Sequence, residues 1–167
     1  QTQATGPYRL AGYCNGALIA FEAAQQLIAA GEDVDFLCLI DPPPASPWRS
    51  EYIKAETFDE FLEQCHLETK FDTPTREEHE YRRWLLNHYY RLSADYTALP
   101  YSGKLSLVFL GDSNPGEWPS VARHHSLHRV SSGGRPHLNA IQDSTAAVGK
   151  IFHDSLADLA AHDRQAV

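Results

Sequence analysis

Three residues of the types that cooperate in nucleophilic catalysis each follow a predicted strand in this 167-residue sequence. Cys14 comes directly after one apolar run, Asp41 directly after the next, and His137 follows the last. A thiolate nucleophile needs a base close to it and a carboxylate that orients the base. Because the loops at the carboxyl ends of parallel strands meet at one edge of a sheet, these positions predict a Cys-His-Asp site. Asp112, after the third strand, is an alternative acid.

The segment GYCNG at residues 12–16 has the pattern of a nucleophile elbow, with an apolar run at Tyr8–Tyr13 before it and a helical pattern that stops at Gly31 after it. The backbones of strand and helix approach closely at such a turn, so small residues are needed on both sides of the nucleophile. The helix N-terminus favours a negative charge there, and the thiolate is the nucleophilic form of cysteine. A free cysteine is more often a small buried apolar residue, but the strand and helix around Cys14 favour the nucleophile.

The rest of the chain predicts an α/β fold with a mostly parallel sheet in a single domain. The elements expected after the first helix are strands at Val34–Ile40, 104–110 and 126–130 and a last helix from about 138 to 159. Residues from about 45 to 100 show no strand pattern and two helical patterns, at 57–67 and 75–92. An insertion of aromatic-rich helices is typical of a lid over a cleft, and equally of two helices that simply pack together.

The composition limits the partners and the kind of site. Lys and Arg number 14 and Asp and Glu 22, a net charge of −8, which argues against nucleic acid or an anionic membrane as partner. Three cysteines without framework spacing indicate reduced thiols in a cytoplasmic protein. His124 and His125 form a pair, but no second cluster at ligand spacing accompanies them, so no metal site is expected.

Residues 6–41, GPYRLAGYCNGALIAFEAAQQLIAAGEDVDFLCLID, resemble the type I thioesterase domains that end nonribosomal peptide and polyketide synthases. The resemblance is strong over this stretch and loose after Pro100. It implies an α/β-hydrolase fold that releases an acyl or peptidyl chain from the phosphopantetheine arm of a carrier protein, normally in the same polypeptide. No cofactor bound directly by the domain is implied.

The resemblance also implies roles for individual residues. Cys14 stands where the family usually has serine, and Asp41, which is 41 − 14 = 27 residues later, matches the position of the family's acid. His137 matches the family's histidine at the end of a longer loop, 134–137. The N–H of Asn15 matches one oxyanion donor. Residues 45–100 match the family's lid.

The N-terminal strands of the family are not in this sequence. The chain is therefore expected to be the C-terminal part of the fold, completed by a preceding segment or by another chain. The first strand would otherwise be an unpaired apolar sheet edge. Little turnover is expected from these residues alone, because the absent strands carry the loop with the second oxyanion donor.

Two other functions stay open on the sequence. A stand-alone hydrolase resembling dienelactone hydrolases would use the same cysteine on small free esters or lactones. A non-catalytic binding module would explain a chain that lacks half of the oxyanion hole.

A cysteine at position 14 has a consequence for the product. Cysteine forms a thioester intermediate, which keeps most of the reactivity of the carrier thioester, whereas serine would form a more stable oxygen ester. The sequence therefore predicts release by cyclisation or aminolysis, with hydrolysis as the side reaction. The alternative is that Cys14 is a tolerated replacement of serine with no change in product.

Overall fold

The computed structural model describes residues 5–47, 76–132 and 137–165. The chain divides into two compact units. One consists of residues Ser46–Thr97, and the other contains the rest of the chain on both sides of it. Within the described ranges, no helix has both the length and the apolar character needed to cross a membrane.

The larger unit is built on a four-stranded sheet in which every strand is parallel to its neighbour. The spatial order follows the chain, with strands β1 (Tyr8–Tyr13), β2 (Val34–Ile40), β3 (Tyr101–Leu110) and β4 (Ala122–Val130). Parallel pairing aligns the carboxyl ends of all four strands at one edge, where a site can form. The predicted α/β fold is confirmed.

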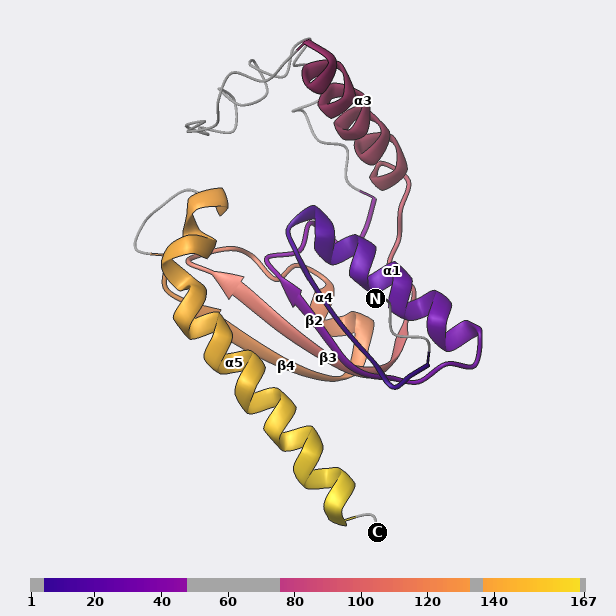
Figure 1. Ribbon diagram of the computed structural model, residues 1–167, viewed down its shortest axis with the longest axis vertical. Helices are drawn as coiled ribbons and strands as arrows, with labels where there is room; N and C mark the ends of the chain where they lie inside the picture. The colour runs from indigo at the N-terminus through magenta and orange to yellow at the C-terminus, as the bar shows by residue number, and fades with distance from the viewer. Residues whose placement is uncertain (1–4, 48–75, 133–136, 166–167) are drawn as a thin grey trace. The chain divides into compact units, whose positions relative to one another are not determined.

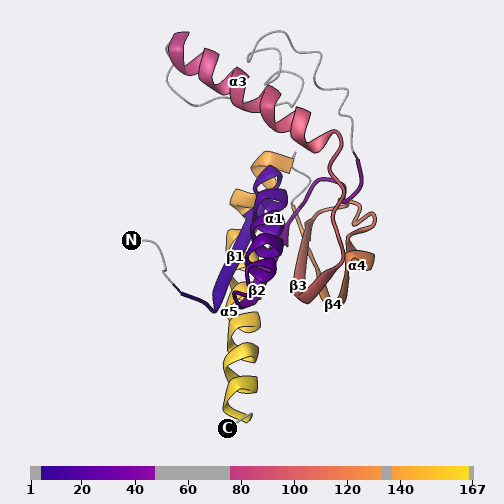
Figure 2. The ribbon, with the colours of Figure 1, turned by 90° about the vertical axis from the view of Figure 1, so that its right-hand side faces the viewer.

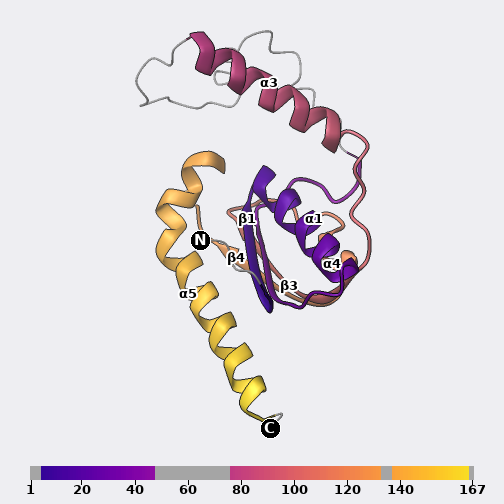
Figure 3. The same cartoon turned by 45° about the vertical axis from the view of Figure 1, so that its right-hand side comes forward.

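Helices cover both faces of this sheet (Figure 3). Helices α1 (Asn15–Ala29) and α4 (Trp118–Val121) lie on one face, where Phe21 packs edge-on against Trp118. Helix α5 (His137–Gln165) lies on the other face, over a core that includes Phe36, Cys38 and Val108 (Figure 1). Burial on two faces explains why β2 and the end of β3 are continuously apolar.

Helix α1, which follows the GYCNG turn, begins and ends where the sequence predicts. Five residues of α1 are buried, namely Ala17, Leu18, Ala20, Phe21 and Ala24, and they recur at helical spacing. Gly31 has a φ of 82°, a left-handed conformation that glycine adopts without a Cβ clash, and the chain leaves the helix there.

Two strands and two helices differ from the sequence expectation, since α5 ends at Gln165 instead of at about 159. β1 and β2 have the predicted bounds, but β3 begins at Tyr101 instead of 104 and β4 at Ala122 instead of 126. The added part of β4, with residues such as His124 and His125, is polar and exposed, because β4 lies at the edge of the sheet. The short helix α4 was not predicted, since four residues give no periodicity.

The smaller unit contributes one described helix, α3 (Arg76–Ser93), close to the predicted 75–92. Glu77 and Glu78 lie in its first turn and Arg91 in its last, an arrangement that the helix dipole favours. The other predicted helix, at 57–67, lies outside the described residues. Trp84 of α3 is 57% exposed and stacks against Tyr81 and His88.

Candidate active site

Cys14 occupies the turn between β1 and α1 in a strained conformation, with φ 52° and ψ −125°. Its N–H donates to Ile40 O at 2.9 Å, which anchors the turn to the neighbouring strand β2. The thiol is half-buried, and its Sγ lies 3.7 Å from Asn15 Oδ1. A positive φ at a non-glycine residue between a strand and a helix is the geometry of a nucleophile elbow. It keeps the nucleophilic side chain from packing against the strand and helix on either side of it.

The glycines on either side of Cys14 have different roles. A Cβ on Gly12 would clash with the backbone of Gly16 and lie 2.6 Å from the Cα of Ala17, so the close approach of strand and helix depends on this glycine. A Cβ on Gly16 would meet no atom of the described residues within 4 Å. The expectation that both flanking positions need a small residue therefore holds for Gly12 and is wrong for Gly16.

Asp41 follows β2 and lies beside the elbow, because β1 and β2 pair with Tyr13 opposite Ile40. Its side chain is 5% exposed, and its Oδ1 accepts the N–H of Leu110 at 3.2 Å. Its own N–H donates to Val108 O at 2.7 Å. Asp41 has a φ of 47°, and among the described residues Cys14 is the other non-glycine residue with a positive φ. Backbone strain of this kind collects at functional sites.

Tyr13 directly precedes Cys14 and pairs with Ile40, the residue before Asp41, and it was not singled out by the sequence. It is half-buried against the core under α5. Burial raises the pKa of its hydroxyl, and the nearby charges of Cys14 and Asp41 raise it further. Tyr13 therefore stays neutral and can be a hydrogen-bond donor beside the site.

The alternative acid, Asp112, lies in a different environment. It is exposed, in the turn after β3. The Arg129 guanidinium holds this turn by donating to Gly111 O at 3.3 Å and Ser113 O at 3.0 Å. These bonds hold the backbone of the turn. The residue Asp112 itself is exposed, whereas Asp41 is buried.

His137 is the first residue of α5, which begins after the carboxyl end of β4 (Figure 1). Its backbone is therefore at the same edge of the sheet as Cys14 and Asp41. Its side chain and the loop 133–136 lie outside what the structure describes. Asn15 is the first residue of α1, where backbone N–H groups have no partner within the helix. Across the described parts of the chain, no group of three metal-ligating side chains lies close enough to hold an ion.

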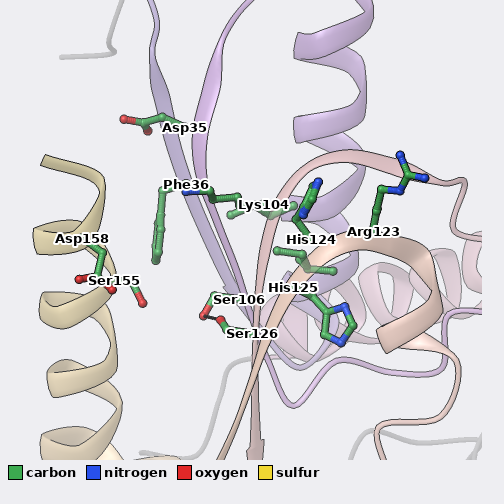
Figure 4. A pocket seen from close by; sticks show the side chains of 12 residues that line it. Asp35, Phe36, Lys104, Ser106, Arg123, His124, His125, Ser126, Ser155 and Asp158 are labelled. Atoms are coloured by element: carbon green, nitrogen blue, oxygen red, sulfur yellow. Dashed lines mark hydrogen bonds between the residues drawn. The ribbon is translucent and has the colours of Figure 1, made fainter. Parts of the chain in front are cut away.

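A cavity of about 420 Å³ lies at the other end of the sheet (Figure 4). The amino-terminal parts of β2, β3 and β4 line it together with Ser155 and Asp158 of α5. The hydroxyls of Ser106 and Ser126 are 3.4 Å apart inside it. Its lining mixes acidic and basic groups, such as Asp158 and Lys104, and includes none of the candidate catalytic residues.

The family follows from a comparison with protein-family models, in which the model described as "Thioesterase domain" matches residues 1–156. The chain belongs to the thioesterase domain family. The likeness to thioesterase domains expected from residues 6–41 is confirmed at the level of the family.

Curated proteins share shorter segments with this thioesterase chain. Atromentin synthetase greA of Suillus grevillei is 54% identical over 44 residues, which is 26% of this chain and 5% of that protein. The non-reducing polyketide synthase CTB1 of Cercospora beticola is 35% identical over 102 residues, 59% of this chain and 4% of that protein. The chain thus spans a small part of the length of the curated relatives that it matches.

Solved thioesterase structures show the same fold. ClbQ, from the colibactin NRPS/PKS pathway, matches 95% of this chain and 72% of its own length with a TM-score of 0.70 at 15% identity. The thioesterase domain SrfTE, whose structure addresses cyclisation of surfactin, matches 90% of this chain and 68% of its own length with a TM-score of 0.64 at 18% identity.

Proposed function

We propose that this thioesterase chain releases an acyl or peptidyl chain from the phosphopantetheine arm of a carrier protein, through Cys14, His137 and Asp41. The observation that carries the proposal is the strained backbone at both Cys14 and Asp41, on neighbouring strand ends. Membership of the thioesterase family and the synthases among its curated relatives support a carrier-bound substrate.

The proposed reaction has two steps. The Cys14 thiolate attacks the thioester carbonyl, and the pantetheine thiol leaves with the proton that His137 took from Cys14. The N–H of Asn15 stabilises the oxyanion from the first turn of α1. A hydroxyl, an amine or water, deprotonated by His137, then attacks the acyl-cysteine, and the Cys14 thiolate leaves. Asp41 orients the imidazole throughout.

Residues 46–97 are proposed to be the lid of the same thioesterase domain. In the sequence they lie between β2 and β3, and they form a compact unit of their own, as expected for an inserted segment. The carrier is proposed to lie in the same polypeptide, because the chain matches only a small part of its multidomain relatives.

The test is covalent loading of the full-length protein with an acyl pantetheine thioester, read as a mass shift on the peptide that contains Cys14. Cys14→Ala should abolish the adduct. The matched control, Cys14→Ser, should still load, as an oxygen ester, and should shift released product from the cyclised or aminolysed form to the free acid. An adduct that persists in Cys14→Ala would remove Cys14 from the mechanism.

A further inference from the structure

Trp118, the first residue of α4, is tied to the segment that follows Asp41. Its indole Nε1 donates to Pro43 O at 2.6 Å, and its side chain is 1% exposed. The ring packs edge-on against Phe21 of α1, with centroids 5.2 Å apart. A buried indole N–H requires an acceptor, and here the acceptor is the backbone two residues beyond Asp41.

The sequence after Asp41 explains why the donor of this bond has to come from another part of the chain. Pro42, Pro43 and Pro44 have no N–H, so these residues can be held by hydrogen bonds only through their carbonyl groups. On the other side, β3 holds Asp41 itself, through Val108 O and the N–H of Leu110. A left-handed aspartate persists only where its surroundings fix it, and on its C-terminal side Trp118 supplies the anchor nearer to Asp41, ahead of the bond from Ala98 N–H to Ala45 O.

We infer that Trp118 is a positioning residue for the thioesterase reaction. Its indole N–H fixes the segment from Asp41 to Pro43 and so keeps the Asp41 carboxylate where it orients the base. This inference rests on the proposed function, because it gives Asp41 the role of the acid.

Trp118→Phe tests the inference in the full-length protein, because phenylalanine keeps an aromatic ring against Phe21 and removes the donor, although it also fills less of the buried space. We expect kcat for chain release to fall by about ten-fold, with little change in KM. A ten-fold fall in kcat equals about 1.4 kcal/mol in the activation free energy. The amide of Leu110 should exchange with solvent faster, because the carboxylate that it bonds is less well held.

Gln25→Ala is the matched control. Gln25 Nε2 donates to Leu99 O at 2.9 Å, beside Ala98, whose N–H donates to Ala45 O, so this side chain holds residues beyond the segment from Asp41 to Pro43. The variant should keep the kcat of the parent protein and the slow exchange of Leu110.

The Asp41→Asn background separates a positioning role from general support of the fold. Asn can still accept the Leu110 N–H, and Trp118→Phe should lower kcat no further in that background. An equal loss in both backgrounds, or an unchanged kcat in Trp118→Phe, overturns the inference.

Amide exchange can be measured without substrate turnover. It therefore tests the positioning role of Trp118 separately from the proposed catalytic function. Unchanged exchange of Leu110 in Trp118→Phe overturns the tether and leaves the proposed triad standing. Full kcat in Asp41→Asn instead overturns the choice of acid, and the positioning role with it.

Discussion

The backbone at Cys14 and Asp41 is where the proposed chemistry begins. Cys14 is held with φ 52° by its hydrogen bond to Ile40 O and by the start of α1. Asp41 is held with φ 47° by hydrogen bonds to β3. A residue in this region costs on the order of 1–3 kcal/mol, which the rest of the fold has to offset. Strain at both residues, and a buried carboxylate, favour Asp41 over the exposed Asp112 as the acid.

Substitutions at the two glycines of the elbow should have opposite effects on stability. Gly12→Ala forces β1 away from α1 and should lower the free energy of unfolding by about 1–3 kcal/mol, as overpacking does. The methyl group of Gly16→Ala meets no atom within 4 Å in the part of the chain that the structure describes, and alanine is a better helix former, so stability should be unchanged or higher by up to about 1 kcal/mol. Urea unfolding of both variants measures the difference, and equal destabilisation would contradict this account of the turn.

The elements bring the nucleophile and the acid together through strand register. Parallel pairing of β1 with β2 places Tyr13 opposite Ile40, so the residues that follow, Cys14 and Asp41, emerge side by side. The order β1-β2-β3-β4 then puts the end of β3, with Asp112, one strand farther from Cys14. Helix α5 begins after β4, and its first residue is His137.

The two carboxylates can be compared directly. Asp41→Asn should lower kcat for chain release on the order of 10²-fold or more, because the base loses the charge that orients it and stabilises its protonated form. The acidic limb of the pH profile should move to lower pH for the same reason. Asp112→Asn, at an exposed turn, should leave kcat and the profile in place. Steady-state kinetics across pH decides, and a loss confined to Asp112→Asn would make Asp112 the acid.

The larger of the two units has two apolar layers, one on either side of its sheet. Phe21 contacts both Trp118 and Tyr101 on the α1 face. Cys38 is fully buried on the α5 face. Burial raises the pKa of the Cys38 thiol to about 12, against the smaller opposing effect of its hydrogen bond with Ser106. Burial likewise raises the pKa of Tyr101 to about 12.

These buried acids should make the fold sensitive to alkali. Below pH 9 the Cys38 thiol is protonated in both states and has no effect on stability. Between pH 9 and about 12 the unfolded chain loses a proton that the folded chain keeps, so the free energy of unfolding falls as pH rises. Cys38→Ala should flatten this slope by up to about 1.4 kcal/mol per pH unit, even though its cavity lowers stability at pH 7. Urea unfolding from pH 8 to 10.5 measures the slope, and an unchanged slope would exclude Cys38 as its source.

The sequence by itself determined the features that depend on local chemistry. The GYCNG turn, the bounds of β1 and β2 and the stop at Gly31 follow from backbone sterics and apolar runs within a few residues. The family could also be predicted from residues 6–41, and the family model matches it.

Only the tertiary structure decided the features that depend on contacts between distant residues. Asp41 and Leu110 are separated by 69 positions, and Trp118 and Pro43 by 75, so no local pattern could pair them. A side chain at position 12 would clash with the start of α1, whereas one at position 16 would meet no described atom within 4 Å. This difference also appears only when strand and helix are placed together. Local preferences set the elements, whereas packing between them fixes the strained backbone and the hydrogen bonds that position the site.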